Sequence, residues 1–165
     1  MLHVGIVACS AELIICPDNT IHEAFPKVEP RSPAPWLHIA RVVAEEAKRA
    51  GHHRLGVLGT CYLMEGPVYP EALSTVGIDS LTPDRADRKQ IDKVIFDQLA
   101  YGIFPDDART YFNHVIAELR DNGCDGVVLG CTEIPLLVRP EESPLPTLDS
   151  TRLLARAALG RAADS

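Results

Sequence analysis

Short apolar runs alternate with amphipathic stretches along this chain of 165 residues. Apolar runs of four or five residues that end at a polar turn are typical of buried parallel strands, whereas apolar positions three and four apart are typical of helices. Prolines between residues 26 and 35 predict an extended linker. The predicted strands are 4–8, 13–16, 55–58, 78–81 and 126–129, and the predicted helices are 20–25, 36–50, 70–76, 85–100, 106–121 and 150–158.

Strands that alternate with helices predict an α/β fold built on parallel sheets. Residues 36–140 have the pattern of a complete lobe, and residues 1–30 together with 145–165 have the pattern of a remnant of another. Only four residues separate the predicted strands 4–8 and 13–16, whereas a parallel crossover needs about a dozen. We therefore expect a well-built second lobe and an incomplete first lobe.

The composition excludes several classes of partner. The net charge is −7 and no basic run occurs, so we expect no binding to nucleic acid or to an anionic membrane surface. No apolar segment is long enough to span a membrane, and residues 1–10 lack the pattern of a signal peptide. Five cysteines without Cys-x-x-Cys spacing indicate a cytoplasmic protein without a structural metal. No glycine-rich phosphate loop occurs, which argues against a nucleotide cofactor.

Side chains that can take part in catalysis or binding gather where the predicted strand 126–129 ends, in the sequence Gly130-Cys131-Thr132-Glu133. A thiol, a hydroxyl, a carboxylate and several backbone N–H groups meet at this turn into a helix, where free N–H groups and the helix dipole favour negative charge. The same field lowers the pKa of a cysteine. We therefore predict a reactive Cys131 thiolate beside a site for a small carboxylic acid.

The segment Leu-Gly-Cys-Thr-Glu-Ile-Pro-Leu-Leu at 129–137 resembles the signature of the aspartate/glutamate racemase family. Segments 4–10 and 16–22 are similar to that family's opening strand and first catalytic loop, and 57–69 is similar to the start of its second domain. The resemblance implies two Rossmann-like lobes with parallel sheets. It also implies an enzyme without metal or other cofactor that moves the α-proton of an amino acid between two catalytic residues.

On this resemblance Cys131 is one catalytic residue, and Asp18 stands where the family has its other cysteine. Glu133 can be the group that orients the thiol, and the resemblance makes His22 a proton-relay partner. The implied substrate-binding residues are Ser10, Asn19, Thr20, Thr60 and Thr132. Each position also has a structural interpretation: a packed cysteine at 131, turn and cap residues at 18–20, 60 and 132, a first-turn acid at 133, and a surface histidine at 22.

Compared with the family, the chain lacks roughly sixty residues of the first lobe, about two βαβ units. The resemblance implies a racemase or epimerase for an amino acid or dicarboxylate of the aspartate or glutamate type, and it allows a homodimer. Three alternatives stay open. They are a lyase similar to arylmalonate decarboxylase, which needs a single cysteine, an enzyme similar to maleate isomerase, and an inactive truncated family member.

Overall fold

The computed structural model describes residues 11–163, and they form two parallel sheets. The larger sheet has the strand order β4 (Asp79–Leu81), β3 (Arg54–Leu58), β5 (Gly126–Leu129), β6 (Thr147–Asp149). In the smaller sheet, β1 (Ile14–Ile15) pairs with β2 (Trp36–Leu37). Because β3 and β5 are adjacent and in parallel register, the residues that follow both strands emerge at the same sheet edge.

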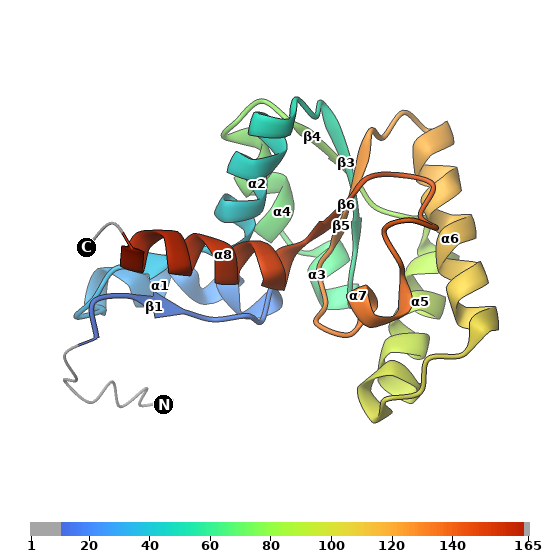
Figure 1. Ribbon diagram of the computed structural model, residues 1–165, viewed down its shortest axis with the longest axis horizontal. Coiled ribbons are helices and arrows are strands. Elements are labelled where there is room, and N and C mark those ends of the chain that lie inside the picture. The colour runs from blue at the N-terminus through green and yellow to red at the C-terminus, as the bar shows by residue number, and fades with distance from the viewer. Residues whose placement is uncertain (1–10, 164–165) are drawn as a thin grey trace.

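Helices cover both faces of the larger sheet (Figure 1). α2 (Ile39–Ala50) and α4 (Val68–Ser74) pack on one face, and α5 (Arg85–Asp97) and α6 (Asp106–Asp121) pack on the other. The strand β5 shows why. Val128 belongs to the apolar cluster that includes residues of α2 and α4, whereas Val127 and Leu129 belong to the cluster that includes residues of α5 and α6. A strand with apolar side chains on both sides needs cover on both faces.

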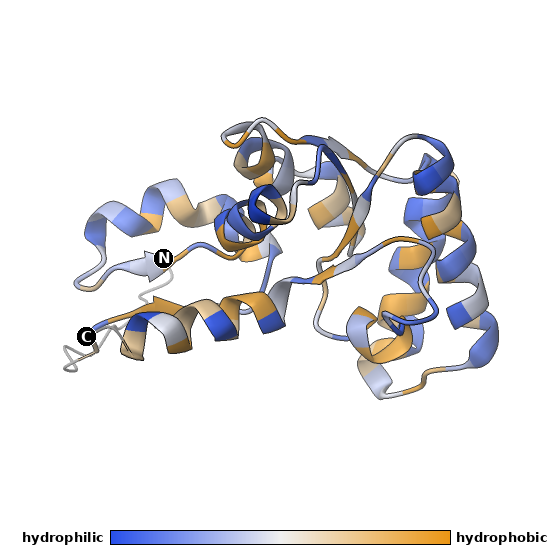
Figure 2. Ribbon diagram, turned by 45° about the horizontal axis from the view of Figure 1, so that its top comes forward, coloured by the Kyte–Doolittle hydropathy of each residue, from blue (hydrophilic) through white to orange (hydrophobic). Residues whose placement is uncertain are grey.

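The remaining elements are short, apart from the last helix. They are η1 (Thr20–Ala24), α1 (Phe25–Val28), η2 (Glu29–Arg31), α3 (Cys61–Glu65), η3 (Leu99–Tyr101), α7 (Ile134–Leu137) and α8 (Ser150–Ala163). α8 leaves the larger sheet after β6 and runs beside α2 towards the smaller sheet. Hydrophobic and hydrophilic residues alternate along α8 (Figure 2), and Leu159 on it is 71% exposed.

The segment 26–35 is not the extended linker that its prolines predict. Its residues 26–31 lie in α1 and η2, and each of these helices has a proline in its first turn, Pro26 in one and Pro30 in the other. Proline is tolerated there because the first N–H groups of a helix have no intrahelical acceptor. The helical crossover joins β1 to β2, so the first lobe retains a parallel strand pair.

Other predicted elements are present, some with their predicted bounds and some with shifted ends. The helix 106–121 and the strand 126–129 have the predicted bounds, whereas the helix predicted for 36–50 begins at Ile39 because Trp36–Leu37 form β2. Residues 147–149 are a strand of the larger sheet rather than a lead into α8. The range 36–140 therefore includes one strand of the smaller sheet, and the range 145–165 includes one strand of the larger sheet. The predicted strand 4–8 lies outside the described residues.

Candidate active site

One cavity of about 320 Å³ collects residues from the two sheets. The loop after β1 supplies one part of its wall, and the turns after β3 and β5 supply the rest. Its lining residues are Pro17, Asp18, Asn19, Thr20, Thr60, Gly130, Cys131, Thr132 and Glu133. The structure thus brings together most of the side chains named from the sequence, from segments more than a hundred residues apart.

Cys131 is a thiol in this arrangement, contrary to the expectation of a thiolate. Its Sγ donates a hydrogen bond of 2.9 Å to Oε2 of Glu133. Burial, together with the hydrogen bond to that carboxylate and its negative charge, raises the pKa of Cys131 to about 12. The predicted field of a helix N-terminus is weak here, because α7 spans only Ile134–Leu137 and begins three residues after the sulfur.

Glu133 is placed as the proton acceptor for this thiol. Burial acts to raise the pKa of Glu133, but hydrogen bonds from Cys131, from the Thr132 side chain and from its own N–H outweigh it, so the pKa is lowered. In this pair Cys131 is therefore the protonated, neutral thiol and Glu133 is the ionised carboxylate. A proton can pass between the two groups over a single hydrogen bond.

Asp18 and Thr60 line the cavity and also act as helix caps. Asp18 Oδ1 accepts a hydrogen bond of 3.0 Å from the N–H of Ile21, at the start of η1, and the residue is exposed. Thr60 Oγ1 accepts a bond of 3.4 Å from the N–H of Leu63 in α3. Capping uses one carboxylate oxygen of Asp18 and leaves the other, so the structural and functional interpretations are compatible.

Asn19 belongs to a buried hydrogen-bond chain. Its Nδ2 donates to Ser150 Oγ at 3.0 Å, and its Oδ1 accepts from the hydroxyl of Tyr69 at 2.6 Å. Ser150 in turn donates to the carbonyl of Leu129 at 2.9 Å. In the sequence, Tyr69 lies in the segment 57–69 that resembles the family and Ser150 stands at the start of a predicted helix, but no local pattern connects position 150 to position 19.

His22 is buried and bonded to backbone on both sides. Its Nε2 accepts from the N–H of Ile39 at 3.3 Å, so Nδ1 carries the proton and donates to the carbonyl of Asp18 at 2.8 Å. Burial lowers its pKa, which favours this neutral form. The ring fixes the backbone of the Asp18 loop and has no nitrogen left for the predicted proton relay.

One remaining candidate is not described by the structure, and two further cysteines do not line the cavity. Ser10 lies outside the described residues. Cys61 bonds the carbonyl of Arg88 through Sγ, and Cys124 is buried in the core. Within residues 11–163, no cluster of three or more His, Cys, Asp or Glu side chains could hold a metal ion. Over the same range, no helix has the length and apolar character needed to cross a membrane.

Comparison with known proteins identifies the family. Residues 7–158 match the model of the Asp/Glu/hydantoin racemase family, and the chain belongs to that family. A curated relative, an uncharacterized protein in the pnlA 3′ region of Pectobacterium carotovorum subsp. carotovorum, is 31% identical over 125 residues. That match covers 74% of this chain and 82% of the relative.

Two solved structures share the fold. A candidate Asp/Glu racemase from Yersinia pestis is 37% identical with a TM-score of 0.86, over 92% of this chain and 66% of that one. An aspartate racemase homologue from Pyrococcus horikoshii OT3 is 28% identical with a TM-score of 0.84, over 93% and 67%. The predicted family and its α/β fold with parallel sheets are confirmed. The chain spans about two thirds of the length of these two structures, in agreement with a truncated first lobe.

Proposed function

We propose that this protein is an amino-acid racemase or epimerase that works by α-proton transfer without a metal or pyridoxal phosphate. The observation that carries the proposal is the shared cavity, in which the Cys131–Glu133 pair and the Asp18 carboxylate come from different sheets. Two acid–base groups that approach a substrate from separate segments suit the exchange of a proton between two faces of a carbon.

Proton transfer would begin with Glu133 taking the thiol proton. The Cys131 thiolate would then remove the α-proton, and a protonated Asp18 would deliver a proton to the other face of the carbanion. The inverted amino acid is released with Cys131 again a thiol, Glu133 holding the original thiol proton and Asp18 ionised. One proton then passes from Glu133 to Asp18 through solvent before the next turnover in this direction. The reverse reaction exchanges the roles of the two residues.

The charge of the cavity favours a zwitterionic substrate. Asp18 and Glu133 line it, and its lining includes neither Lys nor Arg within the described residues. Residues 1–10, beyond that range, contain neither residue type. An α-ammonium group would be attracted to the Glu133 carboxylate, and to Asp18 in the direction in which Asp18 begins ionised. It would also favour the thiolate of Cys131 by its positive charge. The substrate carboxylate would bind the hydroxyl and N–H groups of Thr20, Thr60 and Thr132.

A lyase is the second candidate, because the resting sulfur is a thiol. In an enzyme similar to arylmalonate decarboxylase, the substrate loses carbon dioxide and one thiol protonates the resulting enediolate. The raised pKa of Cys131 suits such a proton donor. The paired carboxylates of the cavity weigh against it, since an arylmalonate brings two further negative charges.

Incubation in heavy water separates the candidates. The protein is mixed with L-aspartate, L-glutamate, neutral L-amino acids or an arylmalonate, with the Cys131→Ala variant as control. Deuterium at Cα together with the D-enantiomer supports the racemase, and release of carbon dioxide supports the lyase. A protein that does neither with any of these acids, and that also leaves maleate unchanged, is the inactive family member. An isomerase similar to maleate isomerase would show itself by conversion of maleate to fumarate.

Formation of a homodimer stays a prediction, and the structure suggests α8 as the surface to test. Leu159 lies 71% exposed on α8, and an exposed apolar side chain can contribute to association when a second copy covers it. If a homodimer forms through α8, Leu159→Glu should shift the sedimentation coefficient to that of a monomer at equal concentration. Phe96→Glu, at a residue that is 49% exposed on α5, serves as the control on another surface.

A further inference from the structure

A buried chain of hydrogen bonds connects α4, the loop after β1, the start of α8 and the end of β5. It runs from Tyr69 through Asn19 and Ser150 to the carbonyl of Leu129. Tyr69 and Ser150 are each 0% exposed, and Asn19 is 4% exposed. Asn19 is the member of the chain that also lines the cavity.

The direction of every bond in this chain follows from its last member. A carbonyl can only accept, so the Ser150 hydroxyl must donate to Leu129. The Ser150 oxygen therefore accepts from Asn19, which puts the Asn19 amide nitrogen on the side of Ser150. The amide oxygen then faces Tyr69, whose hydroxyl donates to it. An asparagine whose two ends otherwise look alike has only one orientation that satisfies the chain.

We propose that Tyr69 and Ser150 are positioning residues that fix the amide of Asn19 so that one N–H is kept for the carboxylate of the substrate. An asparagine amide has two N–H groups, and among the described residues Nδ2 has one acceptor, Ser150. This inference rests on the proposed function for its substrate, but the orientation of the amide can be measured without any catalysis.

Ser150 has a second effect through the same hydroxyl. It holds the carbonyl of Leu129, two residues before Cys131. One side chain thus ties together the two segments that supply Asn19 and Cys131 to the cavity. If the amide turned over, Ser150 would face the Asn19 oxygen and would have to abandon either Asn19 or Leu129, and a buried group without its partner is costly.

The kinetic test uses Tyr69→Phe, Ser150→Ala and the double variant. Each single change should raise KM roughly three- to tenfold, the effect of about one hydrogen bond, with a smaller change in kcat. Because either change alone releases the amide, the double variant should be little worse than the worse single variant. KM values that match the controls, or effects on KM that add fully, would overturn the proposal.

Two matched controls remove hydroxyls elsewhere. Tyr111→Phe deletes a tyrosine bond of the same length, 2.6 Å to Asp87, and Thr151→Val deletes a buried hydroxyl next to Ser150 that has no partner among the described residues. Both should leave KM unchanged while showing what such losses do to thermal stability. If the variants and the controls lose similar thermal stability but only the variants have a raised KM, the loss of stability does not explain the change in KM.

A second measurement decides the proposal even if the wild type exchanges no α-proton, an outcome that would end the proposed function alone. The side-chain amide signals of Asn19 in ¹⁵N NMR are assigned by their loss in Asn19→Ser. Tyr69 bonds the oxygen of the Asn19 amide rather than its nitrogen, yet Tyr69→Phe should speed hydrogen exchange of the NH₂ group about tenfold or more if Tyr69 fixes its orientation. Unchanged protection in Tyr69→Phe would overturn the proposal.

Discussion

The Sγ of Cys131 and the Oε2 of Glu133 lie 2.9 Å apart, with the thiol as donor. This contact reverses the expectation from the sequence, because a neighbouring carboxylate favours the thiol where a helix N-terminus would favour the thiolate. The reactivity of the sulfur should therefore depend on whether Glu133 carries its charge or has accepted the proton.

Alkylation of Cys131 should report its high pKa directly. With a pKa of about 12, the thiolate fraction, and hence the rate with iodoacetamide, should still rise about tenfold per unit from pH 9 to pH 11. Glu133→Gln removes the negative charge, so Cys131 should react faster at pH 8 while α-proton exchange becomes slower. Peptide mass spectrometry follows each cysteine, and Cys61 in the same sample is the reference. Slower alkylation in Glu133→Gln would contradict this account of the pair.

Removal of the sulfur should stop the reaction. Cys131→Ala should lower α-proton exchange by a hundredfold or more, the order of effect of a general acid–base group, as measured by deuterium at Cα. Cys61→Ala should leave the rate nearly unchanged, because Cys61 does not line the cavity. Exchange at the wild-type rate in Cys131→Ala would place the catalytic centre elsewhere.

Asp18 should control the balance between the two directions. Because a cysteine stands at this position in the family pattern, Asp18→Cys should bring the forward and reverse rates closer together. The rates are measured from each enantiomer separately by chiral chromatography. Pro17→Ala, a change at the neighbouring lining residue, is the control. Equal rates in the unmodified protein would remove the basis of this prediction.

Gly130 should tolerate no side chain. A Cβ at this position would lie 2.9 Å from the carbonyl oxygen of Leu58 and would clash with the Leu63 side chain. Gly130→Ala should cost about 1–3 kcal/mol of unfolding free energy and displace Cys131, so denaturant unfolding and α-proton exchange should both be affected. Gly160→Ala on α8, where a Cβ meets nothing within 4 Å, should leave both unchanged.

Acid should destabilise the lobe around β2 through His38. Burial, together with the charges of His22 and Arg41, lowers the pKa of His38 to about 4. A histidine with a lowered folded pKa stabilises the protein above its unfolded pKa of about 6.5, and this contribution is lost as the pH falls towards 4. His38→Phe, which retains an aromatic ring beside Phe25, should therefore lose less Tm between pH 7 and pH 4.5 than the wild type.

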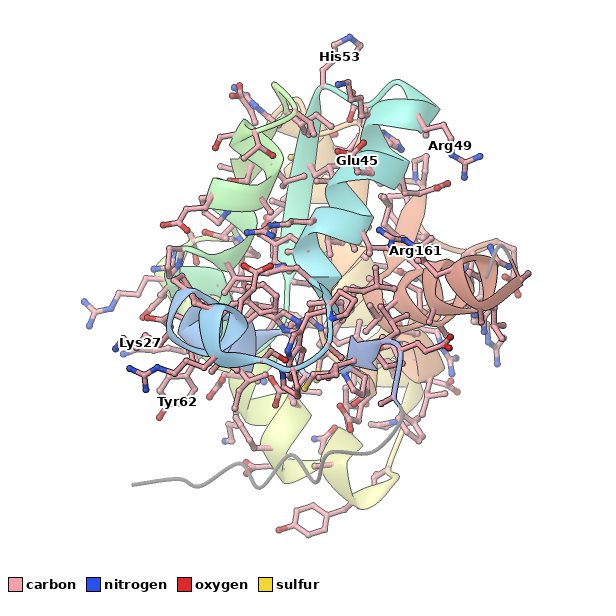
Figure 3. All side chains as sticks on the ribbon, turned by 90° about the vertical axis from the view of Figure 1, so that its left-hand side faces the viewer. Lys27, Glu45, Arg49, His53, Tyr62 and Arg161 are labelled. Carbon is pink, nitrogen blue, oxygen red and sulfur yellow. The ribbon has the colours of Figure 1, made fainter. Side chains whose placement is uncertain are left out.

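The control for acid stability is His53→Gln. Its side chain is 92% exposed and points away from the body of the protein (Figure 3). His53 Nδ1 lies 3.3 Å from Oδ2 of Asp125, but the pKa of that carboxyl is lowered and the group titrates below this pH range, so the variant should retain the wild-type dependence of Tm on pH between 7 and 4.5. If His38→Phe and His53→Gln gave the same profile as the wild type, the acid sensitivity would have another source.

The sequence predicted the site through strand ends. Apolar runs that stop at Thr60 and at Gly130-Cys131 reveal a parallel sheet edge, and the structure places both in one cavity with Asp18. Strand ends can be predicted in this way because an apolar run and the polar turn after it involve only residues that are close together in the sequence. The catalytic and binding roles of these residues stay predictions, which the experiments above test.

What the sequence did not reveal depends on contacts between distant segments. The ionisation of Cys131 is set by burial and by the direction of the Glu133 side chain, and neither follows from a motif. The bond between Asn19 and Ser150 joins positions 131 residues apart. The prolines at 26 and 30 were misinterpreted for a different reason, since a first-turn proline and a linker proline look the same until the helix is seen.

The position of Ser150 has a practical consequence for anyone who shortens this protein. A fragment that ends at residue 149 would contain every lining residue of the cavity, yet it would lack the hydroxyl that joins Asn19 to Leu129. Such a fragment would look complete in an alignment of motifs and still have a loosened binding pocket. The serviceable limit of a minimal domain therefore lies within α8, beyond the last residue that a substrate could touch.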